Sequence, residues 1–130
     1  MLVEDHTLTR DEVRAVIERQ PDMTVVAESR TGEDALDKAR EIRPEIIVMD
    51  ILLPGMNGIS TTRKILAEQP DVKILALSNH SGNSLIQAVL DADALGYVRK
   101  NKAFTELVPA LRSVASGEQY ISDGSSDQKS

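Results

Sequence analysis

Short runs of aliphatic residues alternate along this chain with longer stretches in which apolar residues recur at helical spacing, and the pair occurs five times. The short runs predict strands, at Met1–Val3, Met23–Ser29, Ile46–Met49, Lys73–Leu77 and Gly96–Arg99. The longer stretches predict helices, at Leu8–Arg19, Gly32–Glu41, Ile59–Glu68, Asn83–Asp91 and Phe104–Ser116. Strands with so few polar residues are typical of a sheet that is buried on both faces.

The ends of the predicted helices carry ordinary start and stop signals. Thr31 and Asn57 stand where a side-chain oxygen can cap a helix N-terminus, and Gly117 follows the last helix. A proline follows each of the first three helical stretches. Because five strand–helix units with short connections favour right-handed parallel crossovers, the chain predicts a doubly wound α/β domain. Its five-stranded parallel sheet would have helices on both faces and the flavodoxin-like strand order 2-1-3-4-5.

Length and composition narrow the class of protein. With 130 residues, of which 41% are hydrophobic and 28% charged, the chain fits one soluble domain with a substantial core. A net charge of -6 argues against this segment gripping nucleic acid by itself, and the lack of cysteine excludes disulfides and thiolate metal sites. Two histidines, His6 and His80, are too few for a typical zinc site. The chain shows no secretory signal pattern and no apolar run long enough to cross a bilayer.

Charged residues follow three of the predicted strands at the same end. Glu4 and Asp5 follow the first strand, Asp50 follows the third and Lys100 follows the fifth. Because the carboxyl ends of parallel strands meet at one edge of the sheet, we expect three carboxylates and one amine to gather there. Two carboxylates about 4 Å apart repel by roughly 4 kcal/mol at an effective dielectric of about 20, and a bound Mg²⁺ ion would remove that repulsion.

The same edge carries groups that suit phosphoryl chemistry. The carboxylate of Asp50 can act as a nucleophile toward a phosphoryl group. Ser78, at the end of the fourth strand, can donate its hydroxyl to a phosphoryl oxygen, and Lys100 can add a charge-assisted hydrogen bond. Considered alone, Asp50 is more typical of a turn aspartate, and Lys100 is more typical of a surface lysine. Their shared position at the strand ends favours a functional site.

These residues and their neighbours resemble the receiver (CheY-like) domain of bacterial two-component response regulators over nearly the whole chain. The matching residues are Glu4-Asp5, Asp50 with the turn Leu53-Pro54-Gly55-Met56-Asn57-Gly58, Ser78, and Gly96-Tyr97-Val98-Arg99-Lys100. The stretch Ala115–Ser122 resembles the NarL/FixJ (LuxR-type) class, whose receivers usually precede a helix-turn-helix DNA-binding domain. Residues 1–121 would then be the receiver domain and residues 122–130 a polar, linker-like or disordered tail.

The resemblance implies a role for each residue of the site. Asp50 would be the phosphoacceptor. Asp5, Asp50 and the backbone carbonyl of Leu52 would bind Mg²⁺, with Mn²⁺ as a substitute, and Glu4 would hold a metal-bound water. Lys100 would neutralise the aspartyl phosphate.

The resemblance also implies a switch. The hydroxyl of Ser78 would move toward the phosphoryl group and the ring of Tyr97 would turn inward behind it, so that the face around the fourth helix and fifth strand responds. A separate hypothesis is that Leu52 and His80 set the lifetime of the aspartyl phosphate by controlling the access of water. Asp93 stands where this family commonly has glycine, which leaves the form of the turn into the fifth strand open.

The implied function is that of a signalling phosphoacceptor, which assists its own phosphorylation and dephosphorylation and is not otherwise an enzyme. A sensor histidine kinase would supply the phosphoryl group, and phosphorylation would favour a homodimer. DNA would be contacted only through an effector domain that this chain does not contain. We expect a cytoplasmic protein with no membrane partner.

Other classes stay open. A phosphohydrolase of the haloacid dehalogenase type also uses a strand-end aspartate and Mg²⁺, but it needs a second acid two residues later, where this chain has Leu52. A flavodoxin-like cofactor module would need a phosphate-binding loop after the first strand, where Glu4 and Asp5 would repel phosphate in the absence of metal. The third alternative is a stand-alone or non-phosphorylated receiver that acts as an interaction module.

Overall fold

A computed structural model describes residues 1–79 and 82–122 of the chain. Its elements are β1 (Leu2–Val3), α1 (Thr7–Glu18), β2 (Glu28–Ser29), α2 (Gly32–Ile42), β3 (Ile46–Asp50), α3 (Gly58–Glu68), β4 (Lys73–Ser78), α4 (Asn83–Asp91), β5 (Gly96–Arg99), a 3₁₀ turn (Lys100–Lys102), α5 (Ala103–Ala115) and β6 (Tyr120–Ile121). Within the described residues all strands pair in parallel, in the order β2-β1-β3-β4-β5-β6. This confirms the doubly wound α/β fold and the order predicted for the first five strands.

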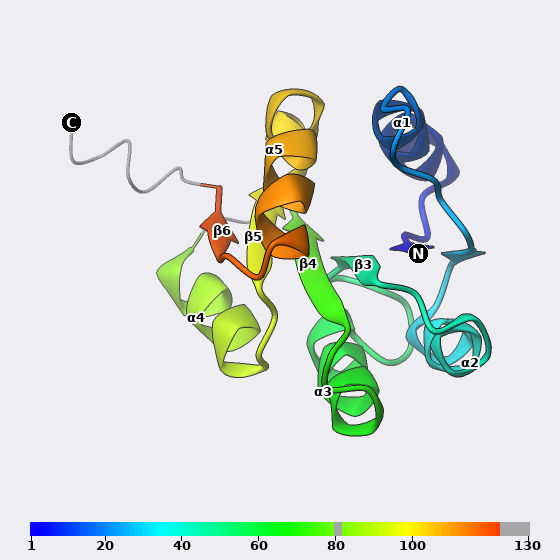
Figure 1. Ribbon diagram of the computed structural model, residues 1–130. Coiled ribbons are helices and arrows are strands. Elements are labelled where there is room, and N and C mark those ends of the chain that lie inside the picture. The colour runs from blue at the N-terminus through cyan, green and yellow to red at the C-terminus, as the bar shows by residue number, and fades with distance from the viewer. Residues whose placement is uncertain (80–81, 123–130) are drawn as a thin grey trace.

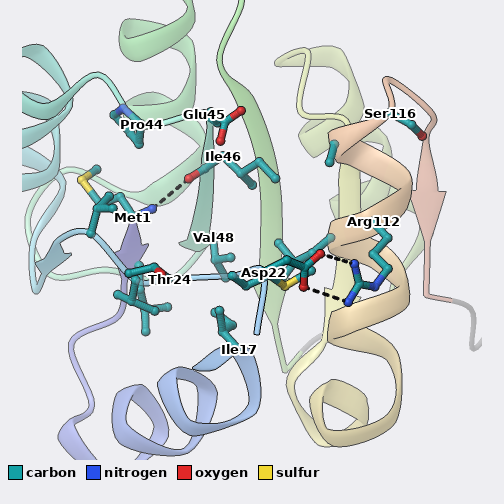
Figure 2. A pocket seen from close by; sticks show the side chains of 16 residues that line it. Met1, Ile17, Asp22, Thr24, Pro44, Glu45, Ile46, Val48, Arg112 and Ser116 are labelled. Atoms are coloured by element: carbon teal, nitrogen blue, oxygen red, sulfur yellow. Dashed lines mark hydrogen bonds and ion pairs between the residues drawn. The ribbon is translucent and has the colours of Figure 1, made fainter. Parts of the chain in front are cut away.

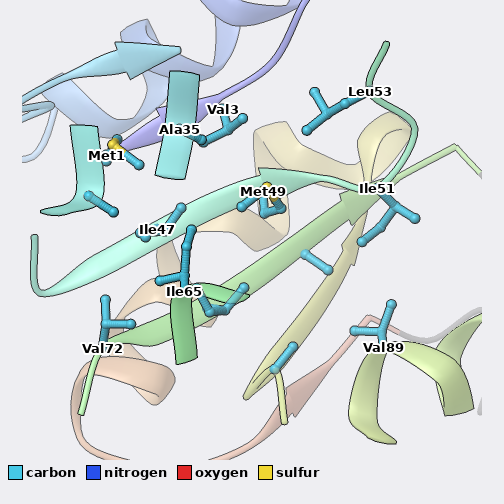
Figure 3. Packing of buried hydrophobic residues seen from close by; sticks show 14 of the residues in the cluster. Met1, Val3, Ala35, Ile47, Met49, Ile51, Leu53, Ile65, Val72 and Val89 are labelled. Atoms are coloured by element: carbon cyan, nitrogen blue, oxygen red, sulfur yellow. The ribbon is translucent and has the colours of Figure 1, made fainter. Parts of the chain in front are cut away.

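Helices cover both faces of the sheet (Figure 1). Alternate residues of β3 point to opposite faces, so Ile47 and Met49 pack on one side and Val48 on the other. The first side is covered by α2, α3 and α4, and Figure 3 shows Ile65 of α3 and Val89 of α4 beside that strand layer. The second side is covered by α1 and α5. Burial on both faces explains why the central strands are almost purely aliphatic.

The helix boundaries fall within a residue of the predicted ones, and the N-termini of α2 and α3 carry the side-chain caps that the sequence predicts. Thr31 and Asn57 accept hydrogen bonds from the backbone N–H groups of Asp34 and Ser60, as N-caps do. Gly117 ends the last helix with a φ of 87°. No helix in the part of the chain that the structure describes is long and apolar enough to span a bilayer.

The second strand is much shorter than predicted. The sequence pattern indicates a strand over Met23–Ser29, but only Glu28–Ser29 pairs, with Leu2 opposite Glu28. The ladder between β1 and β2 has only two pairs, Leu2 with Glu28 and Val3 with Ser29, so within the described residues β1 pairs with the end of the predicted strand alone.

A short sixth strand at the other edge was not predicted. Tyr120 and Ile121 pair with Gly96 and Tyr97 of β5, and the N–H of Ser122 then donates to the carbonyl of Tyr97. Two residues are too few to show a strand period in the sequence. Ser122, predicted as the first residue of the tail, is 1% exposed, and the rest of that predicted tail lies outside the described residues.

Candidate functional site

The predicted charges gather at the carboxyl edge of the sheet. Asp50 is the last residue of β3 and is 2% exposed, while Glu4 directly follows β1 and is completely buried. The pairing of β1 with β3, which places Val3 opposite Met49, brings these two carboxylates side by side. Lys100 follows β5 and reaches the same place from the 3₁₀ turn. The sheet therefore carries two acids and a lysine into one small volume.

Lys100 bridges the two buried carboxylates. Its Nζ lies 2.9 Å from Oε1 of Glu4 and 3.1 Å from Oδ2 of Asp50. Its side chain is only 13% exposed, so these contacts are weakly screened by solvent. The contact between Glu4 and Lys100 was not predicted, because the resemblance assigns these residues to metal-bound water and to phosphate respectively.

The electrostatics of the site are strongly perturbed. Burial first, and then the charge of Glu4, raise the pKa of Asp50 to about 6, although Lys100 and the N–H of Leu52 both act in the opposite direction. Burial by itself would lower the pKa of Lys100, but the hydrogen bond to Glu4 and the charge of Asp50 outweigh it and raise that pKa. One ammonium therefore compensates the charge of two buried carboxylates incompletely.

The third acid lies slightly apart. Asp5 is half-buried, and ligand atoms of Glu4, Asp5 and the exposed His6 all lie within 4.8 Å of one another. His6 occupies the N-cap position of α1 without a side-chain cap, and its backbone N–H donates to Oε2 of Glu4 at 3.2 Å. These oxygen donors, with Asp50 beside Glu4, are the hard ligands that Mg²⁺ and Mn²⁺ prefer, so the residues fit a divalent cation.

The turn after Asp50 holds that carboxylate in place. The N–H of Leu52 donates to Oδ1 of Asp50 at 3.1 Å, while the Leu52 side chain is 56% exposed. Gly58, at the start of α3, donates its N–H to the carbonyl of Ile51 at 2.8 Å. A Cβ at Gly58 would lie 2.2 Å from the Asp50 carbonyl oxygen, so only glycine permits this approach. The turn motif in the sequence includes Gly58, but the close backbone approach that requires a glycine there is visible only in the structure.

Ser78 and Tyr97 lie on neighbouring strands next to the carboxylates. Ser78 ends β4 and is 1% exposed, and Tyr97 in β5 is completely buried, so its ring already points into the core. Burial raises the pKa of Tyr97, and the nearby Ser78 side chain opposes part of that rise. His80, the remaining predicted site residue, lies outside the described residues.

Comparisons with known proteins all point to one protein family. The model of the response regulator receiver domain matches residues 1–112. The chain is 40% identical to the response regulator UvrY of Escherichia coli over 128 residues, covering 98% of this chain and 59% of that protein. It is 36% identical to the transcriptional regulatory protein DegU of Brevibacillus brevis over 121 residues, covering 93% of this chain and 51% of that protein.

A solved structure agrees. The chain superposes on a two-component response regulator of the LuxR family from Aurantimonas sp. with a TM-score of 0.91 and 38% identity, covering 94% of this chain and 87% of that one. The curated relatives are longer, since the chain spans between 51% and 59% of their length.

Proposed function

This chain belongs to the response regulator receiver domain family, and from that premise we propose that Asp50 accepts a phosphoryl group from a phosphohistidine or a small acyl phosphate. The observation that carries the proposal is the buried Asp50 carboxylate beside Lys100 and Glu4. In the transfer, an oxygen of Asp50 forms a bond to phosphorus. The bond from phosphorus to the donor breaks, and its electron pair leaves with the imidazole or the carboxylate of the donor.

A divalent cation completes this chemistry in our proposal. Mg²⁺, or Mn²⁺ in its place, would be held by Asp5, Asp50 and the carbonyl of Leu52, with Glu4 acting through water, and it would neutralise the charge that develops on the phosphoryl oxygens. Lys100 supplies the fixed positive charge of the site, and its contact with Asp50 keeps it within reach of a group attached there.

Phosphorylation would then act on the neighbouring strands. It adds roughly 1.5 to 2 negative charges and strong acceptor oxygens at Asp50. Charge-assisted hydrogen bonds from Ser78 and Lys100 are worth on the order of 1.5 to 3 kcal/mol each, or roughly 3 to 6 kcal/mol together. A shift of a two-state element from about 1% to about 99% needs roughly 5.5 kcal/mol. The two contacts can therefore drive most of a switch at Tyr97 and α4, and dimerisation or a partner would supply the rest.

The proposal also includes the phosphodonor and the output of this switch. The donor would be a sensor histidine kinase in the cytoplasm, and the output would be transcription through a C-terminal helix-turn-helix domain. The support is that this chain spans only 51% to 59% of the length of relatives named as response or transcriptional regulators. We propose no enzymatic substrate beyond the phosphodonor, since Leu52 provides no acid where a phosphohydrolase would need one. Leu52, with His80, would instead tune the lifetime of the phosphoryl group.

Phosphorylation with acetyl phosphate tests the central claim. The protein is incubated with acetyl phosphate and Mg²⁺ and run on a Phos-tag gel, beside Asp50→Asn and the exposed-site control Asp71→Asn. We expect a retarded band in the wild type and in Asp71→Asn, its loss in Asp50→Asn, and its loss when EDTA removes the cation. Equal labelling of Asp50→Asn and wild type would exclude Asp50 as the acceptor. Absence of labelling in all three variants would favour the receiver that acts only as an interaction module.

A further inference from the structure

Arg10 of α1 ties the acid segment of the site to the second strand. Its Nη1 donates to the backbone carbonyl of Glu4 at 3.0 Å, and its Nε donates to Oε1 of Glu28 in β2 at 3.1 Å. The Arg10 side chain is 13% exposed, so these contacts lie at the boundary of the interior. Because a guanidinium presents several donors in a fixed plane, one side chain joins α1, β2 and the residue that precedes Asp5.

Glu28, to which Arg10 is attached, is itself held at two further points. Arg14, one turn after Arg10 on α1, donates to Oε2 of Glu28 at 2.7 Å. Lys38 of α2 donates to the backbone carbonyl of Glu28 at 2.5 Å. Since both the side chain and the backbone of Glu28 are bonded, Glu28 gives Arg10 a fixed point of attachment.

The carbonyl of Glu4 lies just beyond the end of the first strand. The ladders of β1 with its two neighbours end at Val3, and the N–H of Glu4 then donates to the carbonyl of Ser29 at 3.0 Å. Past this point the carbonyl of Glu4 receives its hydrogen bond from the Arg10 side chain. Because this carbonyl and the N–H of Asp5 belong to one planar peptide group, the bond also fixes the direction in which the chain enters Asp5.

An arginine pair at the opposite edge of the sheet has a different character. Figure 2 shows Arg112 of α5 facing Asp22 at the rim of a pocket, with contacts of 2.8 and 3.2 Å. These two side chains are 47% and 61% exposed, and exposed pairs of this kind contribute little to stability. Arg10 is more buried and bonds to the backbone of the site, so its geometry indicates a role at the site itself.

We propose that Arg10 is a positioning residue of the divalent-cation site, which holds the Glu4–Asp5 segment so that Asp5 can bind the cation. This inference rests on the proposed function, in which Asp5 is a ligand and Glu4 acts through water. Groups that orient metal ligands from outside typically change metal affinity by about 10- to 100-fold when they are replaced. Arg10 acts without touching the cation, because its contact is with the peptide group between the two acids.

The charge of Arg10 makes the sign of the effect diagnostic. A guanidinium near the site repels a divalent cation, so removal of its charge alone would strengthen cation binding. Removal of the hydrogen bond to Glu4 would weaken cation binding, because the acid segment would then have to be ordered when the cation binds. A weaker cation site after the loss of a positive charge is therefore the result that positioning predicts and charge repulsion does not.

Titration with Mn²⁺, followed by the EPR signal of the free ion, measures the affinity without any phosphorylation. The full chain is compared with Arg10→Gln, Arg10→Lys and the matched control Arg14→Gln, since Arg14 carries the same charge and contacts Glu28 and Asp11. We expect Kd to rise at least about tenfold in Arg10→Gln, about threefold in Arg10→Lys and less than about twofold in Arg14→Gln. Arg10→Lys should lose less, because an ammonium can keep one of the two hydrogen bonds. Urea melts in EDTA show whether each variant is folded.

Labelling by acetyl phosphate separates this inference from the proposed function. In Arg10→Gln the Mg²⁺ concentration for half-maximal labelling should rise by the same factor as Kd, while the rate at saturating Mg²⁺ stays within about twofold of wild type. Weaker Mn²⁺ binding by Arg10→Gln in a chain that acetyl phosphate does not label would support the positioning role and remove the proposed function.

Other results would overturn the positioning role. These are unchanged or tighter Mn²⁺ binding by Arg10→Gln, an equal loss of affinity in Arg14→Gln, or a wild type that binds no Mn²⁺. Normal labelling of Arg10→Gln at every Mg²⁺ concentration would overturn it while leaving Asp50 as the acceptor. If Arg10→Gln does not fold, Arg10→Lys decides, and a Kd equal to that of wild type would then refute the proposal.

Discussion

Replacing Asp50 with asparagine should stabilise the cation-free protein at neutral pH while it abolishes phosphorylation. The pKa of Asp50 is raised from 3.8 to about 6, mainly by burial and then by repulsion from Glu4. A shift of about two units corresponds to roughly 3 kcal/mol at about 1.4 kcal/mol per unit. This is the cost of holding Asp50 ionised in the folded protein, and a neutral asparagine of the same size avoids it.

The sign of the effect depends on pH. Because the folded pKa is higher than the unfolded one, Asp50 takes up protons on folding between about pH 4 and pH 6. Its contribution to stability is therefore complete below about pH 4 and is lost as the pH rises through about 6. The gain in unfolding free energy of Asp50→Asn over wild type should therefore be absent at pH 3.5 to 4 and should grow as the pH rises from about 4 to about 6. Above pH 7 it should level off at about 2 to 3 kcal/mol, or roughly 5 to 10 °C in Tm.

Urea and thermal denaturation from pH 4 to pH 8, in EDTA, measure this difference directly. Asp71→Asn is the matched control, since Asp71 is exposed and its removal should leave stability within about 0.5 kcal/mol at every pH. Millimolar Mg²⁺ should reduce the advantage of Asp50→Asn, because the cation stabilises the ionised wild-type site. The reasoning is wrong if Asp50→Asn is less stable than wild type at pH 7.5 in EDTA, or if the difference does not vary with pH.

Three further substitutions test the same structure. Lys100→Ala leaves two buried carboxylates without the ammonium that they share, so it should lower the free energy of unfolding by about 3 kcal/mol in urea melts at pH 8. Mg²⁺ should restore part of this loss. An unchanged melt would contradict a stabilising role for the Lys100 bridge. Gly58→Ala forces a Cβ against the Asp50 carbonyl and should lower both Tm and the rate of labelling by acetyl phosphate, whereas normal labelling would show that the turn can relax. Asp93→Gly should stabilise by about 1 kcal/mol in the same melts, since Asp93 has a φ of 71°. Asp91→Gly, at the last residue of α4, should give no such gain, and equal gains from the two would refute the backbone argument.

The fold was largely predictable because its signals are local or periodic. The strands β3, β4 and β5 are continuous aliphatic runs, and each helix carries an apolar face with a recognisable boundary. The strand β2 was not predictable in the same way. Its residues 23–27 have the composition of a strand, but pairing also requires a neighbour, and the register with β1 provides one only from Ala27 onward. A pattern in one segment contains no information on the length of the segment beside it.

The sequence predicted which residues belong to the site better than it predicted which of them contact one another. The strand ends determine that Glu4, Asp50 and Lys100 meet, since parallel strands share one carboxyl edge. Which charge contacts which depends on side-chain reach and burial, and these are set by packing. Glu4 is completely buried and forms an ion pair with Lys100, whereas Asp5 is half-buried and has its carboxylate near that of Glu4 and the ring of His6. The sequence order of the two adjacent acids could not distinguish these environments.

The Lys100 bridge links the stability of the cation-free protein to its proposed function. The amine contacts Glu4 and Asp50 together, so a divalent cation held by Asp50, with Glu4 acting through water, would have to share both acids with Lys100. A phosphoryl group on Asp50 would resolve that competition, because it moves negative charge outward and offers Lys100 acceptor oxygens of its own. Glu4 would then be released from the amine toward the cation. On this view the cation and the phosphoryl group bind more tightly together than singly, with Lys100 as the element that couples them.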